Sequence, residues 1–365
     1  MAGKFIIKGY GMDMTQDSLF SKLKSLPRRL LISEYFILIL CVTLFLGLIP
    51  FIPTIASPYN LSNLFSNIWP LYAVAIGQTF VLIIAGIDLS QGAIISVASV
   101  IGASLIATSV NPDVFGNSPI WGVFLFEDGA ILSHTPWGVP IALLVMLLIG
   151  LLIGFINGAI IAYARIPAFM VTLVMQMFLA ALAIYFVKSE NIINLPAGYT
   201  MIGDDTGLLS ISLATTVVLA VFAQFILSRT MFGRWLYSIG TNIRASVVSG
   251  VPERKVIILT YMFSGFCASV ASILYSTRME MGRPTLGAPF LLDIVGGAVI
   301  GGSSLAGGKG KVLWTFFGVL FLSLLGNVLS LFNVPFFWIQ IVKGSVILLA
   351  TLIDVVRTRL FQYTV

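Results

Sequence analysis

The residues whose types and spacing could support chemistry are concentrated in one glycine-rich stretch. Seven of the fifteen residues from Gly296 to Gly310 are glycine, within an otherwise almost continuously apolar chain. A phosphate-binding loop needs a glycine, four residues, and then Gly-Lys followed by Ser or Thr. Here Ser303 stands at the first glycine position and Gly310 follows Lys309. Because the pattern fails at both ends, the sequence predicts that this chain does not bind ATP.

Close packing within a membrane is the better explanation of these glycines. Small residues let helices approach closely, and irregular backbone survives in a membrane only where protein or an aqueous cavity covers it. We therefore expect Leu291–Leu305 to be a short helix packed at Gly296, Gly297, Gly301 and Gly302. Its Asp293 either faces a polar conduit or caps the helix at the outer membrane interface.

A second polar group lies in Gly86–Gly92, with the sequence GIDLSQG. Asp88 or Ser90 would cap a helix that begins near Gln91, and exposure of both residues to a conduit is the alternative. Weak internal echoes, such as IPAF at Ile166–Phe169 and VPFF at Val334–Phe337, do not decide between parallel and inverted repeats.

The third candidate is Ile239–Lys255, within the long loop 228–255. Thr241 or Asn242 can cap a short helix there, Gly250 stops it, and Pro252 prevents its continuation. A short helix outside the spans suits docking into a groove on a cytoplasmic partner, and an ordinary ordered loop is the alternative.

The composition defines the setting of these residues. Hydrophobic residues make up 58% of the 365 residues and charged residues 9%, and the mean hydropathy is +1.05. Since soluble domains carry about 25% charged residues, the chain is predicted to be an all-α polytopic membrane protein. Cys41 and Cys267 lie in apolar runs without a CxxC pattern, which favours small core residues.

The length accommodates about ten transmembrane helices. Residues 1–34, basic with interleaved leucines, are predicted to form an amphipathic segment on the cytoplasmic surface, before a transmembrane domain at 35–365. A polar interruption is expected at Asn60–Asn67. The ten expected spans are Tyr35–Ile55, Trp69–Ala85, Gln91–Val110, Val139–Ala164, Ala168–Val187, Ile211–Leu227, Val256–Tyr275, Leu291–Leu305, Val312–Phe332 and Phe336–Val356.

Lysine and arginine orient these spans. With the N-terminus inside, sixteen of the twenty basic residues lie in cytoplasmic segments and three, Lys188, Arg278 and Arg283, lie outside. This asymmetry agrees with the positive-inside rule and places both termini in the cytoplasm. The net charge of +6 is thereby explained by topology and gives no reason to expect nucleic acid as a partner. The single histidine, His134, falls in an outer loop, so no Ser–His dyad can form within the membrane.

Four motifs in order resemble the permease subunits of bacterial ABC importers for ribose and related monosaccharides. They are GIDLS at Gly86–Ser90, IPAFMVTL at Ile166–Leu173, the N-x-x-A-x-x-x-S-G-V loop at Asn242–Val251, and LDIVGGAVIGGSSLAGGKG at Leu292–Gly310. The resemblance extends from the second span to the C-terminus. Ser246 departs from the family, which usually has a second alanine there.

The resemblance implies the fold of vitamin B12-type importers and a place in the bacterial inner membrane. A second permease copy, identical or paralogous, would complete the pathway for the sugar substrate. ATP and magnesium would bind to a partner ATPase, often a tandem polypeptide, so this chain would be no enzyme and hold no cofactor. An external substrate-binding protein would deliver the substrate.

Site residues follow from the motifs and from the chemistry of sugars. The residues expected to couple this chain to the ATPase are Asn242, Arg244, Ala245, Ser249 and Gly250. Sugar hydroxyls need weak polar and aromatic partners, and the proposed pathway residues are Asp88, Ser90, Asn157, Phe169, Thr172, Gln176, Asp293 and Ser304. The alternative function is a secondary transporter driven by an ion gradient, for which Asp88 and Asp293 are the candidate carboxylates.

Overall fold

A computed structural model describes residues 35–204 and 210–362 of the chain, with side chains as far as Leu352. The predicted amphipathic segment 1–34 lies outside the described residues. The longer helices are α2 (Phe36–Leu48), α3 (Pro58–Ile83), α4 (Gln91–Ile106), α6 (Gly138–Ala159), α7 (Ala168–Val187), α9 (Ile211–Arg229), α10 (Met231–Thr241), α12 (Glu253–Met279), α13 (Leu291–Ile300), α14 (Val312–Leu331) and α15 (Phe336–Gln362).

Shorter elements connect these helices. A π-helical turn at Ile160–Ala164 extends α6, and 3-10 turns lie at Pro53–Ala56 and Ala288–Phe290. The short helices are α5 (Pro112–Phe115), α8 (Ala197–Thr200) and α11 (Ile243–Val248). Strands β1 (Leu125–Phe126) and β2 (Gly129–Ala130) pair in antiparallel fashion, with Leu125 opposite Ala130.

An apolar helix lies at each of the ten predicted positions. In the described part of the chain, six helices are long and apolar enough to cross a membrane, namely α3, α6 with its π-helical extension, α7, α9, α12 and α14. The other four, α2, α4, α13 and the described start of α15, are shorter. The chain is therefore a mostly helical, multi-pass membrane protein.

The polar interruption expected at Asn60–Asn67 is wrong, because these residues belong to α3. The Ser57 hydroxyl caps this helix by accepting the Asn60 N–H. The Asn60 and Asn327 side-chain amides donate to each other's carbonyl oxygens at 3.0 and 2.9 Å, joining α3 to α14. Paired amides lose their cost of burial, so polar residues continue the helix. The first predicted span, in contrast, is too long, since α2 ends at Leu48.

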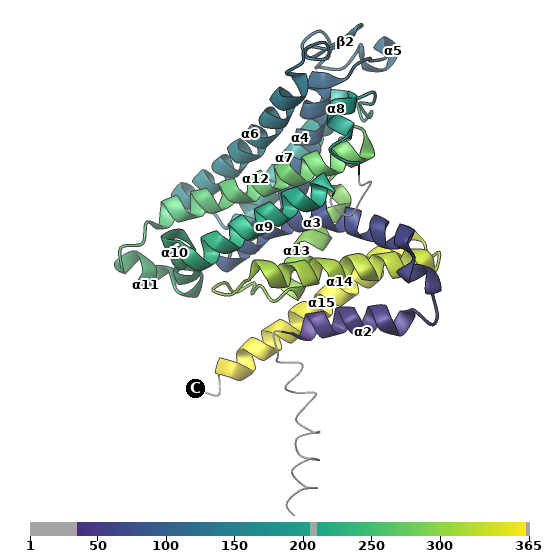
Figure 1. The fold of residues 1–365 in the computed structure, drawn as a ribbon. Coiled ribbons are helices and arrows are strands. Elements are labelled where there is room, and N and C mark those ends of the chain that lie inside the picture. The colour runs from purple at the N-terminus through teal and green to yellow at the C-terminus, as the bar shows by residue number, and fades with distance from the viewer. Residues whose placement is uncertain (1–34, 205–209, 363–365) are drawn as a thin grey trace, which may run out of the picture.

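Helix α3 lies at the centre of the fold, and every residue from Leu71 to Ile83 is buried. Figure 1 shows α6, α9 and α12 in one group of helices and α2, α14 and α15 in another. Helix α3 contacts α9 and α12 of the first group, α14 of the second, and the short α13. Helix α3 therefore connects the two groups of helices.

Glycines bring α6 and α12 into close contact. Gly150, Gly154 and Gly158 recur every four residues along one face of α6. An ideal Cβ at Gly154 would overlap the Tyr261 carbonyl oxygen and lie 2.8 Å from the Met262 Cα. The backbone of α12 thus fills the space that side chains would need, as in other membrane helix pairs with small residues at their interface.

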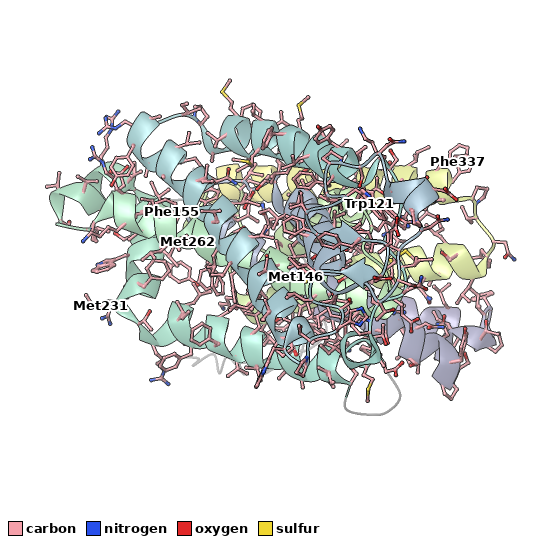
Figure 2. All side chains as sticks on the ribbon, turned by 90° about the horizontal axis from the view of Figure 1, so that it is seen from above. Trp121, Met146, Phe155, Met231, Met262 and Phe337 are labelled. Carbon is pink, nitrogen blue, oxygen red and sulfur yellow. The ribbon has the colours of Figure 1, made fainter. Side chains whose placement is uncertain are left out.

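The two ends of the molecule carry different elements. Helices α10 and α11 lie together at one end, and the hairpin β1–β2 lies with α5 at the top of the view (Figure 1). Figure 2 shows Met231, at the start of α10, on the opposite side of the molecule from Trp121 and Phe337. The segment from α5 to β2 and the segment from α10 to α11 therefore lie at different ends of the molecule.

Candidate functional site

An irregular, non-helical segment separates α3 from α4 and contains the GIDLS motif. Ala85 leaves α3 with a left-handed φ of 58°, and the N–H of Gly86 closes the helix by donating to the Val81 carbonyl at 2.9 Å. Regular helix resumes only at Gln91. The intervening backbone has few partners of its own within the membrane, so side chains must stabilise it.

Asp88 supplies that stabilisation from inside the protein. Its Oδ1 accepts the backbone N–H of Ser90 at 3.0 Å and the Ser90 hydroxyl at 2.6 Å. Its Oδ2 accepts the Ser264 hydroxyl of α12 at 2.6 Å. The carboxylate therefore joins the irregular segment to α12, and within the described chain no lysine or arginine pairs with it.

A second layer of amides extends this network, and the Asn157 Oδ1 and Gln91 Oε1 atoms remain without a hydrogen-bond partner among the described residues. Asn157 on α6 donates to the Ser90 hydroxyl oxygen at 2.9 Å, and Gln91 donates to the Ser264 hydroxyl oxygen at 2.8 Å. Each hydroxyl thus accepts from an amide and donates to Asp88. The side chains are fully buried, and such networks rigidify the segment that they connect.

Capping does not explain Ser90, although it was one of the two expectations. Ser90 does occupy the N-cap of α4, but its side chain makes no cap hydrogen bond; its hydroxyl instead donates to Asp88 and accepts from Asn157. Neither Asp88 nor Ser90 is exposed to a conduit within this single chain, since both are fully buried. The network positions the backbone, and Leu89 is the residue of this segment that reaches a groove.

Three pathway candidates lie on α7 and differ in exposure. The Thr172 hydroxyl donates to the Ile87 carbonyl at 3.1 Å, which places Thr172 beside the break. Phe169 is 50% exposed and Gln176 is half-buried. The structure therefore brings Thr172 to the backbone of the irregular segment beside Asp88 and leaves Phe169 on the open face of α7.

Asp293 and Ser304 lie away from this network. Asp293 Oδ2 forms an ion pair with Lys343 Nζ of α15 at 2.8 Å, and both side chains are largely buried. The alternative that Asp293 caps α13 is wrong, because the helix has Phe290 at its N-cap and no side-chain cap bond. A lysine inside a span needs an acidic partner, and Asp293 of α13 is that partner for Lys343. Ser304 is buried in the loop that follows α13, where its hydroxyl accepts the Ala306 N–H.

The glycines of α13 and of the turn that follows it make different contacts. An ideal Cβ at Gly297 would lie 2.8 Å from Val319 of α14, and one at Gly301 would lie 2.5 Å from the Trp314 carbonyl. Gly296 lies against Ile347 of α15. Gly302 takes no part in this packing, since nothing lies within 4 Å of its Cβ position and its φ of 90° instead requires glycine.

An open groove of about 510 Å³ adjoins both the break and α13. Its lining is mostly apolar and consists of Leu89, Ala288, Pro289, Leu291, Leu292, Val295, Phe336 and Gln340. The groove therefore connects the irregular segment after α3, the start of α13 and the start of α15.

Helix α11 is held firmly but is almost fully exposed. The Asn242 Oδ1 caps it by accepting the Ala245 N–H at 3.0 Å, and Gly250 ends it with a φ of 84°. The side chain of Ser246 is buried and its hydroxyl lies 2.7 Å from that of Ser238 on α10. The predicted boundaries of this helix are confirmed, with Asn242 as the cap.

The exposed side of α11 carries apolar residues. Val248 is 89% exposed, and Ile243 and Val247 are 42% and 46% exposed. Arg244, Ala245 and Ser249 are exposed as well. An apolar patch on an ordered helix outside the long helices is typical of a surface that binds another protein.

Two structural residues escaped the sequence analysis. Ser246 was regarded only as a departure from the family, yet it attaches α11 to α10. Gly240 on α10 packs directly on the backbone of Ile83 and Gly308. Gly240 follows Ile239 in an otherwise helical pattern, and a glycine in such a place was the available signal for close backbone contact.

The chain matches a known family of permeases over most of its length. Residues 60–351 match the family described as the permease component of the branched-chain amino acid transport system. The ribose import permease protein RbsC of Bacillus subtilis is 33% identical over 305 residues, which cover 83% of this chain and 86% of the relative. RbsC of Escherichia coli K12 is 31% identical, covering 81% and 85%. The L-arabinose ABC transporter permease protein AraH of Azospirillum brasilense is 26% identical, covering 90% and 89%. No solved structure matches this fold.

These similarities define the class of the protein, a membrane permease of the ABC transporter type. The chain belongs to the permease family that its residues 60–351 match. This membership confirms the resemblance noted in the sequence and removes the support for an ion-driven secondary transporter. It also agrees with a chain that carries no enzyme activity of its own, because its relatives are permease proteins.

Proposed function

We propose that this chain is the permease subunit of an ATP-driven importer for a monosaccharide or a related small polyol. The observation that carries the proposal is its similarity, over about four-fifths of its length, to ribose import permeases. Xylose and galactose import permeases are also among its relatives. ATP and magnesium would bind to a separate ATPase subunit, since the glycine-rich segment lacks the spacing of a phosphate loop.

The proposed assembly contains two permease chains, identical or paralogous, in a bacterial inner membrane. Each would have ten spans in a fold like that of vitamin B12 importers, with both termini in the cytoplasm. The distribution of lysine and arginine supports this orientation. The end of the molecule that carries α10 and α11 would then face the cytoplasm, and an external binding protein would deliver the sugar to the opposite end.

Helix α11 is the proposed coupling helix that docks on the ATPase. Its exposed Val248, Val247 and Ile243 would fill a groove on the partner, while Ser246 keeps the helix attached to α10. The previously predicted coupling residues Asn242 and Gly250 set the two ends of the helix. Arg244, Ala245 and Ser249 remain proposed contacts because they are exposed on it.

The pathway would run between the two copies, past the groove lined by Leu89, α13 and the start of α15. Phe169 and Gln176 of α7 remain proposed lining residues, because aromatic and amide groups suit sugar hydroxyls and both are at least partly exposed. The buried residues Asp88, Ser90, Asn157 and Thr172 would act indirectly, by keeping Leu89 and its neighbours in place. Asp293 and Ser304 would hold α13 and the loop after it in the same way.

Replacing Val248 tests the docking proposal. Val248→Glu would place a carboxylate in an apolar groove of the ATPase, where burial of an unpaired charge is strongly unfavourable. We expect the affinity of the permease for its ATPase to fall by at least about 30-fold, the effect of losing an interface hot spot.

The measurement is copurification of the ATPase with the permease in detergent or nanodiscs. Met231→Glu is the matched control, because Met231 is 53% exposed at the same end of the molecule but lies at the start of α10. If the Val248 variant retains the ATPase as well as the control does, α11 is not the docking helix.

A further inference from the structure

The last turn of α10 rests directly on the backbone of two other segments. An ideal Cβ at Gly240 would overlap the carbonyl oxygen of Ile83 and lie 2.5 Å from the backbone nitrogen of Gly308. These two groups are hydrogen-bonded to each other, because the Gly308 N–H donates to the Ile83 carbonyl at 2.8 Å. Because Gly240 has no side chain, there is room for a hydrogen bond between the end of α3 and the glycine-rich loop.

Two residues of the glycine-rich loop form the other side of this contact with left-handed backbone. Gly307 and Gly308 have φ values of 86° and 72°, which glycine adopts without steric cost. An ideal Cβ at Gly307 would lie 2.7 Å from the Gly240 carbonyl and 2.8 Å from the Ala85 Cβ. Three segments, the end of α3, the end of α10 and the loop after α13, thus meet backbone to backbone.

A side-chain hydrogen bond fastens the same contact one turn earlier on α10. The Tyr237 hydroxyl donates to the Gly310 carbonyl at 2.7 Å. On the other side, α10 continues through Thr241 and Asn242 into α11, and the hydroxyls of Ser238 and Ser246 lie 2.7 Å apart across that corner. Helices α10 and α11 are therefore linked by covalent structure and by a partly buried hydrogen bond.

Each of the other two segments leads to a break in a membrane helix. Beyond Ile83 the chain enters the irregular stretch that Asp88 holds and that exposes Leu89 to the groove. Preceding Gly307 in the chain, α13 ends at Ile300, and its Leu292 and Val295 line the same groove. The contact at the last turn of α10 therefore adjoins two segments, the end of α3 and the loop after α13, and each of them leads to one wall of the groove.

We propose that Gly240, together with Tyr237, positions the Ile83–Gly308 junction so that a displacement of α11 reaches both groove walls at once. The inference rests on the proposed function, in which α11 docks on an ATPase. Backbone contact matters here because a rotating side chain would absorb a small displacement, whereas packed backbone segments transmit it. Gly240 is a positioning residue, because it contacts neither nucleotide nor sugar.

Gly240→Ala is the direct test, in the complete importer reconstituted into liposomes with its ATPase and binding protein. The methyl group must push α10 away from Ile83 by about 1 Å or more, given the spacing that real Cβ contacts need. We expect the ATPase to remain bound and its basal hydrolysis to persist. We expect uptake per ATP hydrolysed, and stimulation of ATPase by the sugar-loaded binding protein, to fall by about tenfold, a typical coupling factor.

Gly233→Ala is the matched control on the same helix. An ideal Cβ at Gly233 is crowded by the Ile226 and Leu227 carbonyls, with the Leu227 carbonyl carbon at 2.7 Å, but this contact lies at the corner between α9 and α10. The control variant loses stability by the same kind of crowding without touching the junction. Its uptake per ATP should stay at the wild-type value.

Tyr237→Phe keeps the proposal testable if Gly240→Ala fails to fold. This variant adds no volume and removes only the hydrogen bond to Gly310. A reduced ratio of uptake to ATP hydrolysis in either variant, with normal binding of the ATPase, supports the junction. Wild-type ratios in Tyr237→Phe and in any folded Gly240→Ala protein overturn it. Failure of Val248→Glu to weaken ATPase binding is a separate result, which overturns the docking role of α11.

Discussion

At the scale of single residues, two buried carboxylates in apolar surroundings are stabilised in different ways. Asp88 receives three hydrogen bonds from Ser90 and Ser264, while Asp293 receives an ion pair from Lys343. Both side chains were predicted as pathway residues, but both form their polar contacts with other residues of this chain. Their chemistry was readable from the sequence, but the partners were not, because Ser264 and Lys343 lie far along the chain.

The ion pair gives a prediction at this scale. Lys343→Met keeps the side-chain length but leaves the buried Asp293 without its counter-charge, and we expect a loss of about 3 kcal/mol in stability. The double variant Asp293→Asn with Lys343→Met removes both charges, and most of the loss should be recovered. Thermal unfolding of the purified permease in one detergent compares the three proteins.

An additive result would contradict this account of the pair. If the double variant is less stable than Lys343→Met alone, the two groups do not act through their mutual attraction.

At the scale of helices, the apolar runs of the sequence were sufficient to predict an apolar helix at each expected position. The caps were also readable in favourable cases, as Asn242 and Gly250 show at the two ends of α11. The start of α3 was missed because Asn60 and its neighbours are polar. Its helical state depends on Asn327, a partner on α14 that no local pattern reveals.

Contacts between helices were harder to predict than the helices themselves. The spacing of Gly150, Gly154 and Gly158 is visible in the sequence, but its partner surface on α12 emerges only from the fold. Gly296, Gly297, Gly301 and Gly302 were predicted to pack closely, whereas Gly302 instead adopts a left-handed backbone in the turn after α13. The sequence shows where a glycine is, but only the tertiary structure shows whether a close contact with another helix or a left-handed φ requires it.

The α6–α12 contact gives a prediction at this scale. A methyl group in Gly154→Ala would overlap the Tyr261 carbonyl, so we expect a loss of about 2 kcal/mol from overpacking. Gly47→Ala on α2 is the control, since nothing lies within 4 Å of its Cβ position. That variant should be unchanged or slightly more stable, because alanine favours helix. Equal melting temperatures for the two variants would contradict the close packing of α6 on α12.

At the scale of the whole molecule, the proposed docking helix and the groove lie in different parts of the fold. Helix α11 lies at one end of the molecule (Figure 1), the groove adjoins the irregular segment after α3 and the start of α13, and Gly240 contacts the end of α3 and the loop after α13. The family and the membrane class were predictable from ordered motifs and hydropathy. The junction was not, because it joins three segments that are widely separated in sequence.

The central claim is that this chain imports a sugar at the expense of ATP hydrolysed by a partner. The most direct measurement is uptake of labelled monosaccharides, ribose among them, into liposomes that contain the permease, with its ATPase and binding protein supplied on their respective sides. We predict accumulation of one such sugar that requires ATP and the binding protein and that persists when ion gradients are dissipated. Uptake that proceeds without ATP and follows a proton or sodium gradient would contradict the account.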